Sequence, residues 1–308
     1  MEPIYLNSLN STEFKKIIDS FDYVFSDCDG VIWSDVPYPG VGEFFHRIKQ
    51  LGKTVQFVSN NSVRSRKKYE DLFDAANIKC GFENLIIPSI AIAEYLNASN
   101  FDKTVYCMTC PETINILKSY GLKCKNGPED GAELYTSYLD YFDDDDEIGA
   151  VVFDNDYNIN LAKMYKAITY LRRPEVIYLS GASDHYVYLK RGYISLGPGL
   201  FNNVVNEETN RVPIVLGKPG ELLGEFAMKR SGVTEPSRVL FIGDMIKQDV
   251  GLGKVAGFKT LLVLTNHTRE DMMAHPHLKP DFYADSLGSL VPILNNVCLL
   301  DIKAKSSI

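Results

Sequence analysis

The chain has 308 residues, of which 45% are hydrophobic and 23% charged, and its formal net charge is −8. These values are typical of a soluble globular protein with one large domain or two ordinary ones. The negative charge and the lack of a prominent Lys and Arg cluster argue against a nucleic-acid-binding protein. No run of about 18 apolar residues occurs, so we predict no membrane span.

The start of the chain and its cysteines predict a cytoplasmic location. The first eleven residues lack the basic start and the apolar core of a signal peptide. The six cysteines are scattered, which suits reduced thiols. Cys107 and Cys110 have the spacing of a redox or metal pair, but no second pair completes a zinc site. We therefore interpret them as structural cysteines.

The opening of the chain predicts alternating helices and strands. A short helix is expected at Ser11–Ile18, with Ser11 or Thr12 as its N-cap. The order β-α-β-α that follows implies parallel strands joined by right-handed crossovers. Its elements are a strand at Tyr23–Ser26, a helix at Gly42–Leu51, a strand at Thr54–Val58 and a helix at Arg66–Ala76.

The middle of the chain predicts three further strands, at Thr104–Met108, Ile148–Phe153 and Val176–Ser180, and helices at Glu112–Tyr120 and Asn160–Arg172. The acidic run at 143–147 is expected to be a solvated loop, because packed like charges cannot be buried. A calcium loop at Asp154–Asn158 is excluded, since Ile159 and Tyr165 stand where Gly and Glu are required.

Polar residues follow each strand of the last third. A strand at Pro213–Leu216 ends at Lys218, and a strand at Arg238–Ile242 ends at Asp244, with Asp249 five residues beyond. A helix is expected at Glu221–Arg230, and a strand at Thr260–Leu264 ends at Thr265-Asn266. Trp33, the only tryptophan, is expected in the core.

Four strands are thus expected to bring polar residues to one edge of a parallel sheet, where open α/β sheets bind ligands. These residues are Asp27 with Asp29, Ser59, Lys218 and Asp244. Three carboxylates, a hydroxyl and an ammonium suit a doubly charged phosphate. Asp27 and Asp244 would hold Mg²⁺. Lys218, Ser59 and backbone N–H groups near Asn60 would hold phosphate oxygens, and one carboxylate could attack phosphorus.

Four motifs in order resemble a haloacid dehalogenase superfamily phosphatase with a large α/β cap. They are Asp27-Cys28-Asp29-Gly30-Val31, Ser59-Asn60-Asn61-Ser62, Gly217-Lys218-Pro219 and Gly243-Asp244 with Asp249. The branch includes 4-nitrophenylphosphatases, phosphoglycolate phosphatases and pyridoxal phosphate phosphatases. The resemblance implies an α/β fold: a Rossmann-like parallel-sheet core at 1–102 and 208–308, with an α/β cap inserted at 103–207.

The resemblance also implies roles for single residues. Asp27 would be the nucleophile and a Mg²⁺ ligand, and Asp29 the general acid and base, its backbone carbonyl also binding Mg²⁺. Asp244 would be a further metal ligand and Asp249 would orient its neighbours. Ser59, Asn60 and Lys218 would bind phosphate. A specificity loop at Ser180–Tyr188 would present Asp184, His185 and Tyr186 to the substrate.

The expected function is therefore Mg²⁺-dependent hydrolysis of a small-molecule phosphate monoester through an aspartyl-phosphate. Substrates like phosphoglycolate, pyridoxal phosphate or 4-nitrophenyl phosphate all fit. Two alternatives stay open: a phosphotransferase, and a binding or regulatory protein with little activity. The resemblance is compatible with a homodimer through the cap. Ala182-Ser183 stands where many relatives carry Thr-Asn, and Met245 where many carry Arg.

Overall fold

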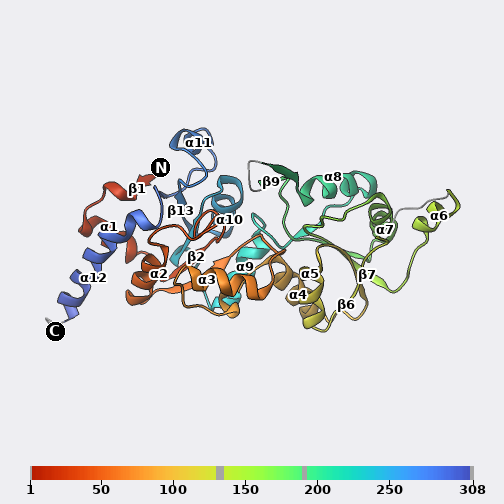
Figure 1. Cartoon of the computed structure of the whole chain (residues 1–308), viewed down its shortest axis with the longest axis horizontal. Helices are drawn as coiled ribbons and strands as arrows, with labels where there is room; N and C mark the ends of the chain where they lie inside the picture. Colours follow the sequence, from red (N-terminus) through yellow and green to blue (C-terminus); the bar gives the residue numbers. More distant parts are fainter. Residues whose placement is uncertain (1, 130–134, 189–192, 306–308) are drawn as a thin grey trace. The chain divides into compact units, whose positions relative to one another are not determined.

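The computed structural model describes residues 2–129, 135–188 and 193–305. The chain divides into two compact units, each with its own parallel sheet (Figure 1). The first unit comprises Met1–Ser59, Arg66–Ile86 and Pro219–Ile308, and the second comprises Asn60–Ser65 and Ile87–Lys218. The insert predicted at 103–207 lies within the second unit, which also takes in 60–65, 87–102 and 208–218. The division into a core at 1–102 and 208–308 and a cap at 103–207 stays a prediction.

The first unit is built on a seven-stranded sheet in which every pairing is parallel. The register sets Ser26, the last residue of β2, opposite Ile242 of β12 and Phe57 of β3. These three strands therefore end at the same edge of the sheet. In sheet order the strands are β1 (Ile4–Tyr5), β14 (Phe282–Ala284), β13 (Lys259–Val263), β12 (Val239–Gly243), β2 (Tyr23–Ser26), β3 (Thr54–Val58) and β4 (Leu85–Ile86).

Apolar stripes at helical spacing pack the helices of this unit onto the core. In α2, for example, the buried residues Val41, Phe44, Phe45 and Ile48 repeat every three or four positions. The longer helices are α1 (Ser11–Ile18), α2 (Val41–Gln50), α3 (Arg66–Ala75), α9 (Glu221–Ser231), α10 (Gly251–Ala256), α11 (Arg269–Met273) and α12 (Val291–Lys305). Short helical turns are η1 (Leu6–Ser8), η2 (Phe82–Asn84), η5 (Pro236–Arg238), η6 (Ile246–Val250) and η7 (Gly288–Leu290).

Helix α1 has the predicted bounds, but the predicted N-cap, Ser11 or Thr12, is wrong. The cap is Asn10, whose side-chain oxygen accepts from the N–H groups of Thr12 and Glu13, each at 3.0 Å. The Glu13 carboxylate in turn accepts from the N–H of Asn10 at 3.1 Å. This reciprocal pair satisfies more of the open N–H groups at the helix start than a hydroxyl one residue later could.

The second unit carries a five-stranded parallel sheet in the order β11-β8-β7-β5-β6. Figure 1 shows α7 and α8 on one side of these strands and α4 and α5 on the other. The strands are β5 (Thr104–Met108), β6 (Lys123–Lys125), β7 (Ile148–Phe153), β8 (Ile177–Ser180) and β11 (Ile214–Val215). The helices are α4 (Pro88–Ala98), α5 (Pro111–Ser119), α6 (Tyr135–Leu139), η3 (Asp140–Phe142), α7 (Leu161–Leu171) and α8 (Pro198–Thr209). Strand β9 (Tyr186–Tyr188) pairs antiparallel with β10 (Ile194–Leu196).

One predicted strand belongs to a different sheet from the one expected. We expected the strand before Lys218 to join the sheet that carries Asp27 and Asp244, and this is wrong. Strand β11 instead pairs with β8 in the second unit, with Ile214 opposite Leu179. It is a two-residue edge strand, and it follows α8 of the same unit closely. Apolar character predicts a strand, but it does not say which partner the strand will find.

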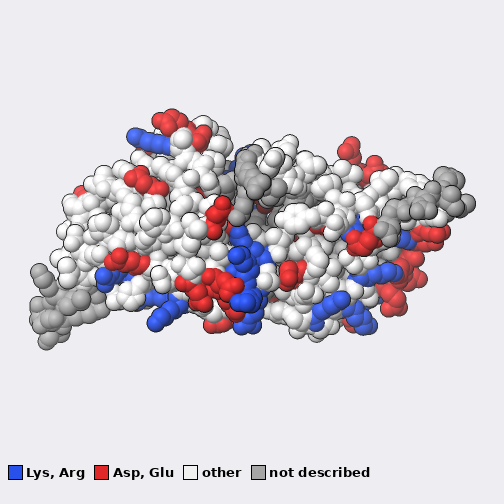
Figure 2. Space-filling model, in the orientation of Figure 1, with Lys and Arg blue, Asp and Glu red and all other residues white. Residues whose placement is uncertain are grey.

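The acidic run at 143–147 is a solvated loop, as predicted. Asp145 pairs with Lys125 at 2.7 Å and Asp144 with Arg173 at 3.0 Å. Figure 2 shows acidic and basic side chains gathered together over this end of the second unit. Exposed pairs of this kind contribute at most about 1 kcal/mol each.

No helix within the described ranges combines the length and the apolar character needed to cross a bilayer.

A buried ion pair lies inside the second unit. The Lys163 side chain is 1% exposed, and its ammonium lies 3.2 Å from Asp156, whose side chain is 4% exposed. Glu129, at 3.0 Å, is a second and more exposed partner. Asp156 also accepts from the N–H of Asn158 through its other oxygen. Lys163 therefore depends on these carboxylates for its charge to be tolerated inside the protein.

We expect Asp156→Asn to lower the free energy of unfolding by about 3 kcal/mol, because it leaves the Lys163 charge short of a buried partner. The substitution keeps the oxygen that Asn158 uses. Asp144→Ala, which removes a surface ion pair in the same unit, is the control and should cost less than about 1 kcal/mol. Urea unfolding measures both. Equal losses would mean that Glu129 alone compensates Lys163.

Candidate active site

Asp27 continues the line of β2 and is 6% exposed. Its N–H donates to the Ile242 carbonyl at 2.8 Å, so the sheet pairing with β12 runs on through the residue. The N–H of Cys28 donates to its Oδ1 at 2.7 Å, which fixes the carboxylate at the strand's end. Burial and a charged hydrogen bond together hold this side chain in one orientation.

Asp244 and Asp249 come from the segment that follows β12, and each is 1% exposed. Asp249 lies in the π-helical turn η6, and its Oδ2 accepts from the N–H groups of Asp244 (3.0 Å) and Met245 (2.9 Å). A Cβ on Gly243 would lie 2.1 Å from the Cβ of Asp249, so only glycine allows this approach. Met245 contributes to this contact through its backbone N–H.

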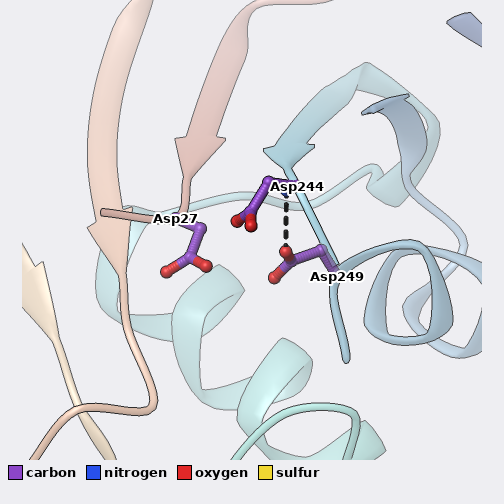
Figure 3. A group of neighbouring side chains, drawn as sticks. All are labelled: Asp27, Asp244 and Asp249. Carbon is purple, nitrogen blue, oxygen red and sulfur yellow. Dashed lines mark hydrogen bonds between the residues drawn. The ribbon is translucent and has the colours of Figure 1, made fainter. Parts of the chain in front are cut away.

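The three carboxylates converge on one small volume (Figure 3). Asp27, Asp244 and Asp249 each offer an oxygen that lies within 4.8 Å of the others. At an effective dielectric of 20, each such pair of charges repels by roughly 3 kcal/mol. A hard divalent cation relieves this repulsion, and carboxylate oxygens are the ligands that Mg²⁺ prefers. The chemistry of the donor set therefore fits a magnesium ion.

The turn after Asp27 packs directly against this cluster. Gly30 has φ +79°, and a Cβ there would lie 2.3 Å from Oδ2 of Asp244. The same oxygen accepts from the Asn266 side-chain amide at 2.7 Å. Asp29 lies in this turn and is half-buried. Its carboxylate is not one of the three that converge in the described part of the chain, and the prediction gave its backbone carbonyl, not its carboxylate, to the metal.

Asn266 is a site residue that the sequence interpretation missed. It comes three residues after the end of β13, so its position after a strand was the available signal. Tyr38 also lies near this group: burial and the charges of Asp244 and Asp29 raise its pKa.

Ser59 ends β3 in the first unit and is 1% exposed. Its hydroxyl accepts from the Tyr69 hydroxyl at 3.3 Å, and its N–H donates to the Ile86 carbonyl. The next residue, Asn60, belongs to the second unit, so a unit boundary falls on a single peptide bond of the second motif.

Asn60 and Lys218 form a reciprocal pair within the second unit. The Lys218 N–H donates to Oδ1 of Asn60 at 2.7 Å, and the Asn60 amide donates to the Lys218 carbonyl at 3.1 Å. Lys218 is 2% exposed. The second and third motifs, which are 158 residues apart in sequence, are therefore bound to each other.

The three residues assigned to substrate specificity have different surroundings. Asp184 accepts from the Asn60 amide at 3.3 Å, so it joins the Asn60–Lys218 pair. His185 lies 3.3 Å from the Asn203 amide on α8. Tyr186, on β9, is 54% exposed. Their roles toward a substrate stay predictions.

Comparisons with known proteins agree with this fold. A family model described as haloacid dehalogenase-like hydrolase matches residues 24–123, and a second model of that kind matches residues 215–290. Phosphoglycolate phosphatase 2 of Arabidopsis thaliana is 33% identical over 298 residues, covering 94% of this chain and 98% of that protein. The 4-nitrophenylphosphatase of Schizosaccharomyces pombe is 28% identical, covering 90% and 96%.

A solved phosphatase structure is also similar to this chain. The p-nitrophenyl phosphatase of Archaeoglobus fulgidus superposes with a TM-score of 0.76 at 30% identity, covering 89% of this chain and 99% of that one. The matched family models include the segments that carry Asp27 and Asp244. The chain therefore belongs to the haloacid dehalogenase-like hydrolases.

Proposed function

We propose that the chain is a Mg²⁺-dependent phosphatase that hydrolyses a small phosphate monoester through an aspartyl-phosphate on Asp27. The observation that carries this proposal is the convergence of three buried carboxylates at the ends of two adjacent parallel strands. The chain is similar to relatives named as phosphatases over nearly their whole length, which supports the same reaction.

Asp27, Asp244 and Asp249 would hold the metal, whose charge would offset that of the carboxylates and of an incoming phosphate. The prediction gave Asp249 an orienting role. Its Oδ2 accepts from two backbone N–H groups, which supports that role, while its place in the cluster also suits a ligand. We assign both to Asp249.

The reaction needs one nucleophile and one proton carrier. Asp27 attacks phosphorus, and the bond from phosphorus to the substrate's alcohol oxygen breaks as Asp29 gives that oxygen a proton. Water then attacks phosphorus and passes a proton to Asp29. The bond between phosphorus and Asp27 breaks, which releases phosphate and restores both carboxyl groups.

Phosphate oxygens would be bound by Ser59, Asn60 and Lys218. Lys218 is a buried cation, which is favourable only where it meets negative charge. The pairing of Asn60 with the Lys218 backbone supports a joint role for the two motifs.

The names of relatives give the substrates to test first: phosphoglycolate, 4-nitrophenyl phosphate and glycerol 3-phosphate, with pyridoxal phosphate added. Release of free phosphate supports the hydrolase. Transfer of phosphate to an added alcohol would indicate a phosphotransferase, and inactivity toward the whole panel would favour a binding or regulatory protein.

We expect Asp27→Asn to lower the turnover of 4-nitrophenyl phosphate by about ten-thousandfold, because the amide cannot act as the nucleophile. The substitution keeps the size of the side chain and an oxygen for the Cys28 N–H. Asp22→Asn, which removes an exposed pair with Arg238 in the same unit, is the control and should retain activity. An active Asp27→Asn enzyme would rule out the aspartyl-phosphate.

We expect Mg²⁺ to raise the unfolding temperature relative to EDTA, since an ion at one hundred times its Kd adds about 2.7 kcal/mol to the stability. Asp249→Asn should be more stable than the wild type in EDTA, because one repelling charge is removed, and should respond less to Mg²⁺.

Thermal unfolding in MgCl₂ and in EDTA makes this measurement. Asp285→Asn, which changes an exposed carboxylate bound to the Tyr5 hydroxyl, is the control and should respond as the wild type does. If Asp249→Asn and the wild type gain equally from Mg²⁺, Asp249 is not a ligand.

A further inference from the structure

A further buried carboxylate, Asp154, lies outside the three-carboxylate cluster, in the second unit. It follows β7 directly and is 2% exposed. Its Oδ1 accepts from the N–H of Asn155 at 2.8 Å and from the N–H of Ala182 at 3.3 Å. The chain wraps closely around it: a Cβ on Gly181 would lie 2.6 Å from the other oxygen, Oδ2.

Asp154 faces Ser62, which belongs to the second motif and is fully buried. Burial raises the pKa of Asp154 to about 6, and the Asn155 N–H and the Ser62 hydroxyl oppose that rise. Among the described residues, neither Oδ2 of Asp154 nor the Ser62 hydroxyl makes a hydrogen bond of normal geometry to any group. The Ser62 hydroxyl is nevertheless one of the groups that act on the Asp154 pKa. The two are thus polar neighbours in a buried place where a lone polar group is costly.

Ser62 is held on its backbone side as well. The Cys110 thiol donates to the Ser62 carbonyl at 3.5 Å. The segment Asn60–Ser65 accordingly belongs to the second unit, although the residues before and after it belong to the first. This part of the second motif is thus held by contacts within the second unit.

Two residues before Ser62, Asn60 makes the reciprocal pair with Lys218, and its side-chain amide also donates to Asp184. Between them and beyond, the Asn61 side-chain oxygen accepts from the Val63 N–H at 3.3 Å, which closes a turn around Ser62. Only two peptide bonds of fixed length separate Ser62 from Asn60, so a displacement of Ser62 acts directly on Asn60.

We propose that Asp154 is a positioning residue that, through Ser62, holds Asn60 in the orientation needed to bind phosphate. The proposal rests on the proposed function, because it takes Asn60 as a phosphate-binding residue. Asp154 itself is assigned no contact with substrate. A merely structural Asp154 would affect the stability of the second unit, but not the affinity of the folded enzyme for phosphate.

The test compares Asp154→Ala, Asp154→Asn and Ser62→Ala with the wild type in the presence of Mg²⁺. Asp154→Ala and Ser62→Ala should raise the KM for 4-nitrophenyl phosphate and the Kd for inorganic phosphate by about tenfold, which corresponds to about 1.4 kcal/mol of binding free energy. The kcat should change much less. Asp154→Asn should stay close to the wild type, because its amide retains an acceptor for Asn155 and can donate to Ser62.

Hydrogen exchange of the amides at 60–65 is the second readout, and it needs no turnover. It should be faster in Asp154→Ala and Ser62→Ala, but not in Asp154→Asn. Asp156→Asn is the matched control: it destabilises the same unit, and it should leave KM and the exchange of this loop relative to the rest of the unit unchanged.

The proposal is overturned if exchange at 60–65 does not change in Asp154→Ala, or if it rises while the affinity for phosphate stays that of the wild type. It is also overturned if Asp154→Asn is as impaired as Asp154→Ala, since charge and not the contact to Ser62 would then matter. If Asp154→Ala does not fold, Ser62→Ala decides. A wild type that binds phosphate without releasing it from any ester would contradict the proposed function and leave this test intact.

Discussion

Mutual repulsion of three buried carboxylates is the constraint around which the first unit is arranged. Asp27, Asp244 and Asp249 can approach within 4.8 Å only because rigid elements hold them there. Two parallel strands in register end side by side, and a π-helical turn brings Asp249 back onto the N–H groups that follow β12. Those N–H groups and the Asn266 amide offset part of the negative charge. The remaining negative charge suits a cation, and the proposed binding of Mg²⁺ would therefore be coupled to folding.

Local sequence pattern predicted the elements well because the parallel strands are buried on both faces. The strands expected at Thr54–Val58, Thr104–Met108 and Ile148–Phe153 have those bounds in the structure. Strand partnership could not be predicted in the same way. β11 satisfies the pattern of a strand that ends in polar residues, yet it pairs with β8, and pairing depends on residues distant in sequence. That α4 and the segment 60–65 belong to the second unit could not be predicted for the same reason.

Some residues of the candidate site could be predicted from the sequence, and others could not. Asp27 and Asp244 could be predicted from the joint pattern of polar residues after several strands, although each alone would suit an ordinary turn. Asn266 resembles any polar residue after a strand, and only its bond to Asp244 distinguishes it. Asp154 entered the sequence interpretation only as part of a calcium loop that was excluded. Its importance comes from complete burial, which depends on Gly181 and on the second motif packing from elsewhere in the chain.

Trp33 gives this protein a built-in optical reporter. It is the only tryptophan, it is fully buried as expected, and its carbonyl accepts from the Gly30 N–H at 2.7 Å in the turn that carries Asp29. Its ring lies edge-on to Phe73 at 5.0 Å and 6.5 Å from Tyr69, whose hydroxyl donates to Ser59. All intrinsic tryptophan fluorescence therefore comes from a residue that neighbours the turn of the first motif and the tyrosine bound to Ser59 of the second motif. Because tryptophan emission depends on the polarity around the ring, a rearrangement of this turn would change the fluorescence, with no label attached.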